Sequence, residues 1–362
     1  MGKTHYIIPI FVPHEGCPHN CVFCNQRSIT GFQNNVNGEF VKKTIEEYLK
    51  TINSENATVE VSFFGGSFTA IDINRQNELL DVASRYKKEG KIDFIRMSTR
   101  PDCIDEKILD NLKKYDADII ELGVQSLDDE VLLKSSRGHS VEDVYNASNL
   151  IKKYGFTLGH QIMLGLPGDN FKKDIETTKK VIEMAPDISR IYPALVIKHT
   201  PMEEMCKSGV YKPYSLEQAV EICKDVYGML MGNNINVIRI GLQPTDEINV
   251  GKELVAGPFH PSFRELVEGS IYSDMIYDEI RNKKFSNLSI EVNPRDISKL
   301  YANKKQFFND IIKQFSTSKI KIHQDCKLAR GNIILNIDDN CNKMSFYNYV
   351  QKKYKKGYRM FI

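Results

Sequence analysis

Three cysteines near the N-terminus have the spacing of iron–sulfur ligands. The segment EGCPHNCVFCNQ places Cys17, Cys21 and Cys24 in a Cys-x3-Cys-x2-Cys pattern, with the aromatic Phe23 just before the last cysteine. Four thiolates would fill a [4Fe–4S] cube, so three leave one iron without a protein ligand. An open iron can bind a substrate, as an open position does on catalytic zinc. The spacing therefore predicts a [4Fe–4S] cluster with one substrate-binding iron.

Zinc is the alternative metal for this loop. Zinc accepts a Cys3His ligand set, and His14 or His19 could supply the fourth ligand. The loop, however, follows a predicted strand at the start of a β/α pattern, which is unusual for a small zinc module. We therefore favour the cluster.

Two later strand ends carry residues suited to binding a small ligand. Gly65 and Gly66 end the run FFGG, and paired glycines allow close approach of backbone to a ligand. Thr99 and Arg100 end another strand, where the guanidinium could pair with a carboxylate. The alternative for Arg100 is a surface arginine before the turn-forming Pro101.

Further candidates lie in the segments ELGVQS, SSRGHS and LGHQIMLG. Gln125 falls at a strand end, where its amide could hydrogen-bond a ligand hydroxyl, and Glu121 points the same way unless it is a paired core acid. Arg137 could bind a ligand carboxylate. Strand alternation turns only one of His160 and Gln161 toward the inside of the sheet.

The first 245 residues alternate β-rich runs with amphipathic helical stretches. This order predicts parallel strands with crossover helices, and six or more such units suit a partial (β/α) barrel. The candidate residues all follow strands, and the carboxyl ends of parallel strands form the functional edge of such a sheet. The predicted strands are Tyr6–Val12, Val59–Phe64, Phe94–Ser98, Ile119–Val124, Leu158–Gly165, Arg190–Val196 and Val237–Ile240.

The chain after residue 250 has a different pattern. Helix Glu265–Asn282 is followed by a strand, a helix, two strands and a last helix, which predicts a small α+β domain. We expect two domains, a partial barrel over residues 1–250 and the α+β domain over residues 251–362. No apolar run is long enough to span a membrane, and the N-terminus lacks the apolar core of a signal peptide. A cytoplasmic protein is expected.

The net charge of +2 conceals an asymmetry between the two parts. Residues 281–362 carry 18 Lys and Arg against 6 Asp and Glu, a net of +12, and residues 1–280 carry a net of −10. Such asymmetry suggests a polyanion-binding module at one end. The candidate RNA-binding residues are Lys352, Lys353, Lys355, Lys356 and Arg359, interleaved with tyrosines. The alternative is an amphipathic helix over Met344–Lys355 whose lysines are merely solvated.

From Arg100 to Gln243 the sequence resembles the radical S-adenosylmethionine (SAM) domain of the Elongator catalytic subunit family. The matching stretches are TRPD, ELGVQS, RGHS, IMLGLPG and IYPALVIKHTPMEEMCKSGVYKPYS. The resemblance implies a partial barrel in which a [4Fe–4S] cluster cleaves SAM reductively to a 5′-deoxyadenosyl radical, with an electron donor such as flavodoxin or ferredoxin. By position it marks the three cysteines as cluster ligands. It marks Gly65, Gly66, Gln125 and Arg137 as SAM-pocket residues, to which we add Thr99 and Arg100.

The sequence departs from the Elongator pattern in two places. The Elongator cysteine loop is longer between its first two cysteines, and no acetyl-CoA-binding signature follows residue 250. The C-terminal part instead resembles the small domain of bacterial Elongator-like radical SAM proteins. Modification of tRNA or rRNA is therefore the favoured function. The alternatives are radical SAM chemistry on a small molecule such as a tetrapyrrole, and a haem-binding or RNA-binding protein that keeps the cluster fold.

Overall fold

The computed structural model describes residues 4–12, 17, 19–25, 36–52, 57–242, 252–313 and 320–355. The chain divides into two compact units, Met1–Pro213 with Leu242–Gly257 and Tyr214–Gly241 with Pro258–Ile362. The second unit therefore includes a helix and a strand that precede the boundary near residue 250 suggested by the sequence.

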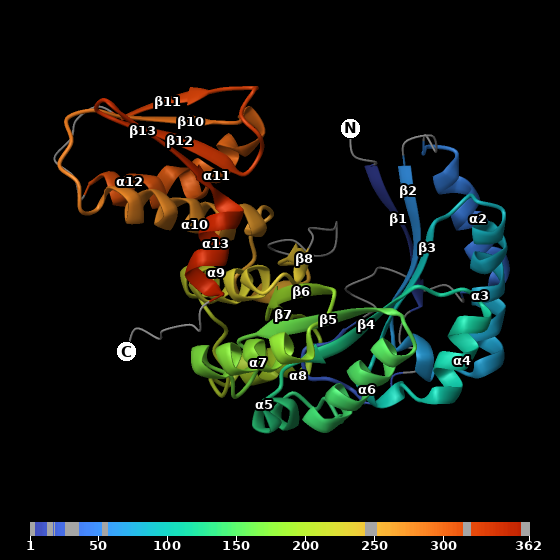
Figure 1. Ribbon diagram of the computed structural model, residues 1–362. Helices are drawn as coiled ribbons and strands as arrows, with labels where there is room; N and C mark the ends of the chain where they lie inside the picture. The colour runs from blue at the N-terminus through green and yellow to red at the C-terminus, as the bar shows by residue number, and fades with distance from the viewer. Residues whose placement is uncertain are drawn as a thin grey trace. The chain divides into compact units, whose positions relative to one another are not determined.

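A curled parallel sheet lies at the centre of the first unit, and all of its strands belong to that unit except the last, β8 (Asn236–Ile240), which belongs to the second (Figure 1). Its order, β1-β2-β3-β4-β5-β6-β8, follows the chain, as expected when every connection is a crossover helix. The strands are β1 (Thr4–Val12), β2 (Ala57–Gly65), β3 (Phe94–Thr99), β4 (Ile119–Gln125), β5 (Thr157–Leu164), β6 (Ile188–Pro193) and β8 (Asn236–Ile240). The predicted partial (β/α) barrel is confirmed.

Helices cover the outer face of this sheet (Figure 1). Ile95 and Met97 on β3 and Leu122 on β4 are fully buried there. Their strand neighbours point to the inner face, because side chains alternate along a strand. The helices are α2 (Gly38–Leu49), α3 (Ile73–Lys88), α4 (Glu106–Lys114), α5 (Asp129–Lys134), α6 (Val141–Lys153), α7 (Phe171–Met184) and α8 (Pro201–Lys207). A small pair of strands, β7 (Val196–Ile197) and β9 (Leu254–Ala256), completes the described part of this unit.

The second unit packs helices on one face of a four-stranded sheet ordered β11-β10-β12-β13. Its strands are β10 (Leu288–Val292), β11 (Ile320–Gln324), β12 (Asn332–Ile337) and β13 (Asn340–Ser345). Its helices are α9 (Leu216–Gly232), α10 (Phe263–Ile280), α11 (Ile297–Leu300), α12 (Gln306–Ile312) and α13 (Phe346–Tyr354). The sheet has one strand more than the sequence suggests, because β13 (NCNKMS) is polar and lacks the apolar alternation typical of strands.

No helix in the described part of the chain is long and apolar enough to cross a lipid bilayer.

Candidate functional site

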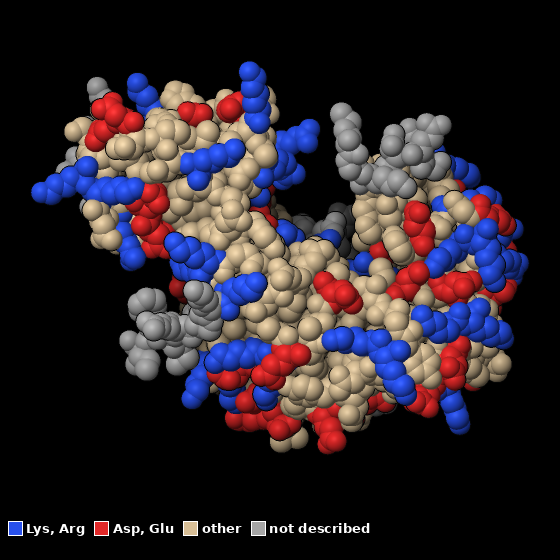
Figure 2. Space-filling model, viewed as in Figure 1, with Lys and Arg blue, Asp and Glu red and all other residues tan. Residues whose placement is uncertain are grey.

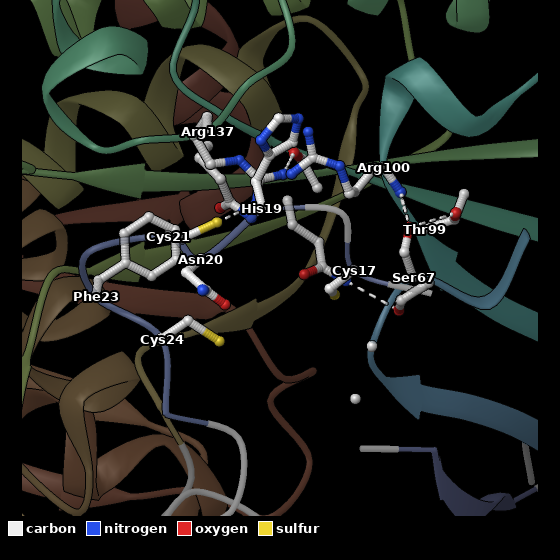
Figure 3. Close-up of a pocket in the computed structure, with 16 residues that line it drawn as sticks. Cys17, His19, Asn20, Cys21, Phe23, Cys24, Ser67, Thr99, Arg100 and Arg137 are labelled. Carbon is white, nitrogen blue, oxygen red and sulfur yellow. Dashed lines mark hydrogen bonds between the residues drawn. The ribbon is translucent and has the colours of Figure 1, made fainter. Parts of the chain in front are cut away.

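A cavity of about 260 Å³ lies at the carboxyl ends of the first five strands (Figure 3). It brings together all nine residues that the sequence marks for cluster and cofactor: the three cysteines, both glycines, Thr99, Arg100, Gln125 and Arg137. The remaining lining residues are His19, Asn20, Phe23, Ser67, Ser98, Gly123 and Gln161.

The cysteine loop is held in place by the backbone and side chain of Val22. The Val22 amide donates to the Ser135 carbonyl oxygen at 3.1 Å, and the Val22 carbonyl accepts from the Met202 amide at 2.9 Å. The Val22 side chain is buried with Val196, Met202 and Tyr211, and Phe23 packs against the same cluster. These contacts fix the middle of the loop, so the cysteines on either side of it face the cavity (Figure 3).

The glycine turn after β2 requires glycine at its first position. Gly65 has a φ of +107°, a region that other residues rarely adopt, and a Cβ there would lie 2.8 Å from the Val12 carbonyl oxygen. Gly66 follows, and its amide donates to the same oxygen at 2.8 Å. The turn is therefore tied to the end of β1, immediately before the cysteine loop.

Thr99 and Arg100 occupy a hydrogen-bonded rim of the cavity. The Thr99 hydroxyl lies 3.1 Å from that of Ser67 and 2.6 Å from that of Thr69. The Arg100 guanidinium makes a two-pronged ion pair with Asp102, both contacts at 2.9 Å. Arg100 thus lines the cavity, and its charge is paired with that of Asp102. Thr99 chiefly holds Ser67 and Thr69 in place through hydrogen bonds between their hydroxyls.

Gln125 places a hydrogen-bond acceptor, its side-chain oxygen, in the wall of the cavity. The residue has a φ of +64° at the end of β4 and is 9% exposed. Its side-chain oxygen is buried and has no hydrogen-bond partner among the residues that the structure describes. A buried acceptor left unpaired costs free energy, so this oxygen is suited to accept from a ligand hydroxyl or amine.

Arg137 contacts the cysteine loop directly. Its Nη1 donates to the Cys21 sulfur at 3.2 Å and its Nη2 donates to the Gly123 carbonyl oxygen at 2.6 Å (Figure 3). His139, two residues on, is buried. Burial together with the charges of Arg137 and Arg100 lowers its pKa to about 3, so the imidazole is neutral at physiological pH.

The inner face of the sheet beneath the cavity carries a buried ionic layer, in which Glu60 and Glu121 pair with two arginines. Glu121 accepts from Arg96 at 2.8 Å, from Arg190 at 2.9 Å and from Gln161 at 3.0 Å. Glu121 is therefore a paired core acid rather than a ligand-facing carboxylate. The prediction for the fifth strand is confirmed, since Gln161 lines the cavity and His160 is buried on the other face against Ser148.

The donors around the cysteines suit an anionic iron–sulfur cluster. Burial holds the pKa of Cys17 above its usual value, although a hydrogen bond from the Ser67 backbone opposes this effect and favours the thiolate. The guanidinium of Arg137 lies on Cys21, so two of the three sulfurs have donors that would stabilise thiolates. Among the described residues, no three Cys, His, Asp or Glu side chains converge as around a single metal ion. Of the two histidines in the zinc alternative, His19 lines the cavity and His14 lies outside the described residues.

Sequence reasoning missed Ser67, Asn20 and Gly123 in this cavity. Ser67 directly follows the glycine turn, and its hydroxyl accepts from the Arg100 amide at 3.0 Å. Its position directly after a strand end could have identified Ser67 from the sequence. Asn20 and Gly123 have no comparable signal, because the first lies within the cysteine loop and the second is a small residue inside a strand.

The described candidate RNA-binding lysines lie in the second unit, Lys352 and Lys353 on α13 and Lys355 directly after it. Lys352, Lys353 and Lys355 are exposed, and Lys353 also pairs with Asp274 at 3.0 Å and with Asp278 at 3.7 Å. Tyr354 is buried and packs closely on Gly228. Helix α13 is amphipathic, as the alternative interpretation expects, but it begins at Phe346 and not at Met344. RNA binding by these lysines stays a prediction. Lys356 and Arg359 lie outside the described residues.

Comparison with known proteins identifies matching family profiles and similar proteins. The radical SAM superfamily profile matches residues 11–181, and the radical SAM C-terminal domain profile matches residues 186–273. A tRNA uridine(34) acetyltransferase of Methanocaldococcus jannaschii is 31% identical over 255 residues, covering 60% of this chain and 47% of that protein. Elongator complex protein 3 of Saccharomyces cerevisiae is 30% identical over 204 residues, covering 51% of this chain and 37% of that protein.

The chain spans about half the length of the curated relatives it matches, or less. Among solved structures, an N-terminally truncated Elp3 of the archaeon Methanocaldococcus infernus superposes with a TM-score of 0.61 at 24% identity. That alignment covers 94% of this chain and 75% of the other, and at this identity it shows the fold. On the matching profiles, and with three cysteines facing a cavity at the carboxyl end of a curled parallel sheet, the chain belongs to the radical SAM superfamily.

Proposed function

We propose that this protein is a radical SAM enzyme that modifies RNA, either tRNA or rRNA. The observation that supports the proposal is the cavity, because one small space is lined by the three cysteines, the glycine turn and two buried polar atoms, Gln125 Oε1 and Arg137 Nε, that have no hydrogen-bond partner among the described residues. Cys17, Cys21 and Cys24 would hold a [4Fe–4S] cluster, and SAM would lie beside it. When bound, cluster and SAM together supply a 5′-deoxyadenosyl radical able to abstract a hydrogen atom from a substrate.

The protein's own residues would bind and orient SAM. The backbone at Gly65–Gly66 can approach a ligand closely, because neither glycine has a side chain. The unpaired oxygen of Gln125 is a ready acceptor for a ribose hydroxyl. Gln161 is oriented by Glu121, whose carboxylate accepts a hydrogen bond from the Gln161 side-chain nitrogen and so fixes which way the amide points. Such preorganised groups lower the entropic cost of holding SAM in one pose.

RNA is the substrate class that the relatives and the charge distribution support. The similar archaeal protein is named as a tRNA uridine(34) acetyltransferase. Residues 281–362 carry a net charge of +12, and lysines and arginines attract phosphate groups. On the face seen in Figure 2, Lys and Arg side chains are spread over the second unit rather than gathered on α13. The single electron for SAM cleavage would come from flavodoxin or ferredoxin.

Nucleoside mass spectrometry of a deletion strain tests the substrate. We expect one modified nucleoside to be absent from total tRNA or rRNA of the deletion strain and restored by the wild-type gene. The Cys21→Ala gene is the matched control and should fail to restore it. Unchanged nucleosides in both RNA classes would contradict the RNA proposal and direct attention to a small-molecule substrate.

A further inference from the structure

Four arginines lie buried at or beneath the cavity, and three of them have carboxylate partners. The paired ones are Arg96 with Glu121, Arg190 with Glu121 and Arg100 with Asp102. Arg137 is 6% exposed and differs from them, because it makes no ion pair with any carboxylate in the described part of the chain. Its two terminal nitrogens contact a backbone carbonyl and the Cys21 sulfur, and its Nε has no hydrogen-bond partner within the described ranges.

A guanidinium in this position needs a counter-charge. Arginine stays protonated in proteins, and a buried charge without a partner of opposite sign is strongly destabilising. The sulfur of Cys21, at 3.2 Å from Nη1, is the contacting group that becomes anionic when it ligates iron. The unpaired arginine is thus matched to a thiolate rather than to a carboxylate of the protein.

The backbone fixes this contact. Ser136 and Gly138, on either side of Arg137, both have positive φ, at +52° and +77°. The Ser135 carbonyl accepts from the Val22 amide, one residue after Cys21. A Cβ on Gly138 would collide with the His19 ring at 2.3 Å, so residues 135–138 pack directly against the cysteine loop. Cys21 and Arg137 are therefore held together by backbone contacts as well as by their own hydrogen bond.

We propose that Arg137 is a positioning residue that sets the reduction potential of the cluster through its charge-assisted hydrogen bond to the Cys21 sulfur. This inference rests on the proposed function, since it requires a [4Fe–4S] cluster at the cysteine loop. Hydrogen bonds to the ligating sulfurs and nearby charge are recognised determinants of cluster potential. Reduction adds one electron, which a donor such as flavodoxin or ferredoxin would supply, and a fixed positive charge stabilises the more negative product. Arg137 therefore makes reduction easier.

Arg137→Gln tests this role, because it keeps a hydrogen-bond donor and removes the charge. The cluster potential is measured by redox titration followed by electron paramagnetic resonance, on reconstituted full-length protein without SAM. We expect reduction to become about tenfold less favourable, which for a one-electron couple is a lowering of 59 mV. Arg137→Lys, which keeps the charge but not the planar fork, should lie between Gln and wild type.

Lys134→Gln is the matched control. It removes the same charge three residues earlier, from an exposed side chain paired with Glu130 on the surface of α5. The reduction potential of the cluster in Lys134→Gln should equal that of the wild type. Equal potentials for wild type and Arg137→Gln would overturn the inference, as would an Arg137→Gln protein whose only defect is weaker SAM binding.

A measurement on unsubstituted protein covers the case in which the variants bind no cluster. With guanidinium nitrogens labelled as 15N, pulsed electron paramagnetic resonance of the reduced wild-type cluster should detect a 15N coupling. Absence of that coupling would overturn the inference. Failure of the wild-type protein to assemble any [4Fe–4S] cluster is a separate result, which would refute the proposed function itself.

Discussion

Cys17, Cys21 and Cys24 differ in their exposure, yet the proposal gives each the same role. Cys21 is buried and the other two are partly exposed. Replacing any one with Ala removes a ligand, so we expect loss of the cluster from a protein that otherwise holds about four iron atoms per chain. Iron and sulfide analysis of anaerobically purified protein measures this. Cys223→Ala is the control, because Cys223 is a buried cysteine on α9, and an iron content equally low in this variant would contradict the assignment.

Gly65 offers a second test at the scale of one residue. Gly65→Ala should lower the melting temperature and weaken SAM binding, because the new Cβ would meet the Val12 carbonyl oxygen at 2.8 Å. Gly90→Ala is a close control, since Gly90 also has a positive φ, at +69°, but nothing lies within 4 Å of its added Cβ. The control should lose only roughly 1–2 kcal/mol of stability through its backbone conformation. Equal losses of stability and SAM affinity in both variants would show that the turn does not need close packing.

At the scale of elements, the position of the cysteine loop depends on apolar packing and not only on its ligands. Val22→Ala removes two buried methyl groups from the cluster formed with Val196, Met202 and Tyr211, a loss of roughly 1.5–2 kcal/mol. We expect a lower denaturant midpoint and faster loss of iron to a chelator, with all three cysteines present. Val210→Ala makes the same change at a residue that is 75% exposed. This control should change neither the denaturant midpoint nor the rate of iron loss. Normal iron retention in Val22→Ala would contradict the anchoring role.

The elements of the barrel could be predicted from the sequence because each strand is apolar and each is followed by an amphipathic helix. The cavity residues could be predicted because most lie at or just after strand ends, as Gln125 does at the end of β4 and Gly65 at the end of β2. The partners of these residues could not. Nothing in SSRGHS indicates that Arg137 contacts Cys21, 116 residues away in sequence, because that contact depends on tertiary packing. The same holds for Lys353, whose partners Asp274 and Asp278 lie on another helix.

At the scale of the whole molecule, RNA binding through α13 should depend on its exposed lysines. Replacing Lys352 and Lys355 with Ala should weaken RNA binding and reduce the slope of log affinity against log salt by roughly 2, about one per lost phosphate contact. Filter binding or fluorescence anisotropy between about 50 and 200 mM salt measures the slope. Lys42→Ala with Lys43→Ala, on the exposed face of α2, makes an equal charge change in the first unit. An equal change of slope in both double variants would refute a role for α13.

The central claim is that the cysteine loop carries out reductive cleavage of SAM. The most direct measurement is the amount of 5′-deoxyadenosine formed from SAM by reconstituted protein with dithionite under anaerobic conditions, quantified by mass spectrometry. We predict slow formation of 5′-deoxyadenosine and methionine by the wild-type protein and none by Cys21→Ala. A wild-type protein that holds a reducible [4Fe–4S] cluster yet forms no 5′-deoxyadenosine, or a Cys21→Ala protein that forms as much as the wild type, would contradict the claim.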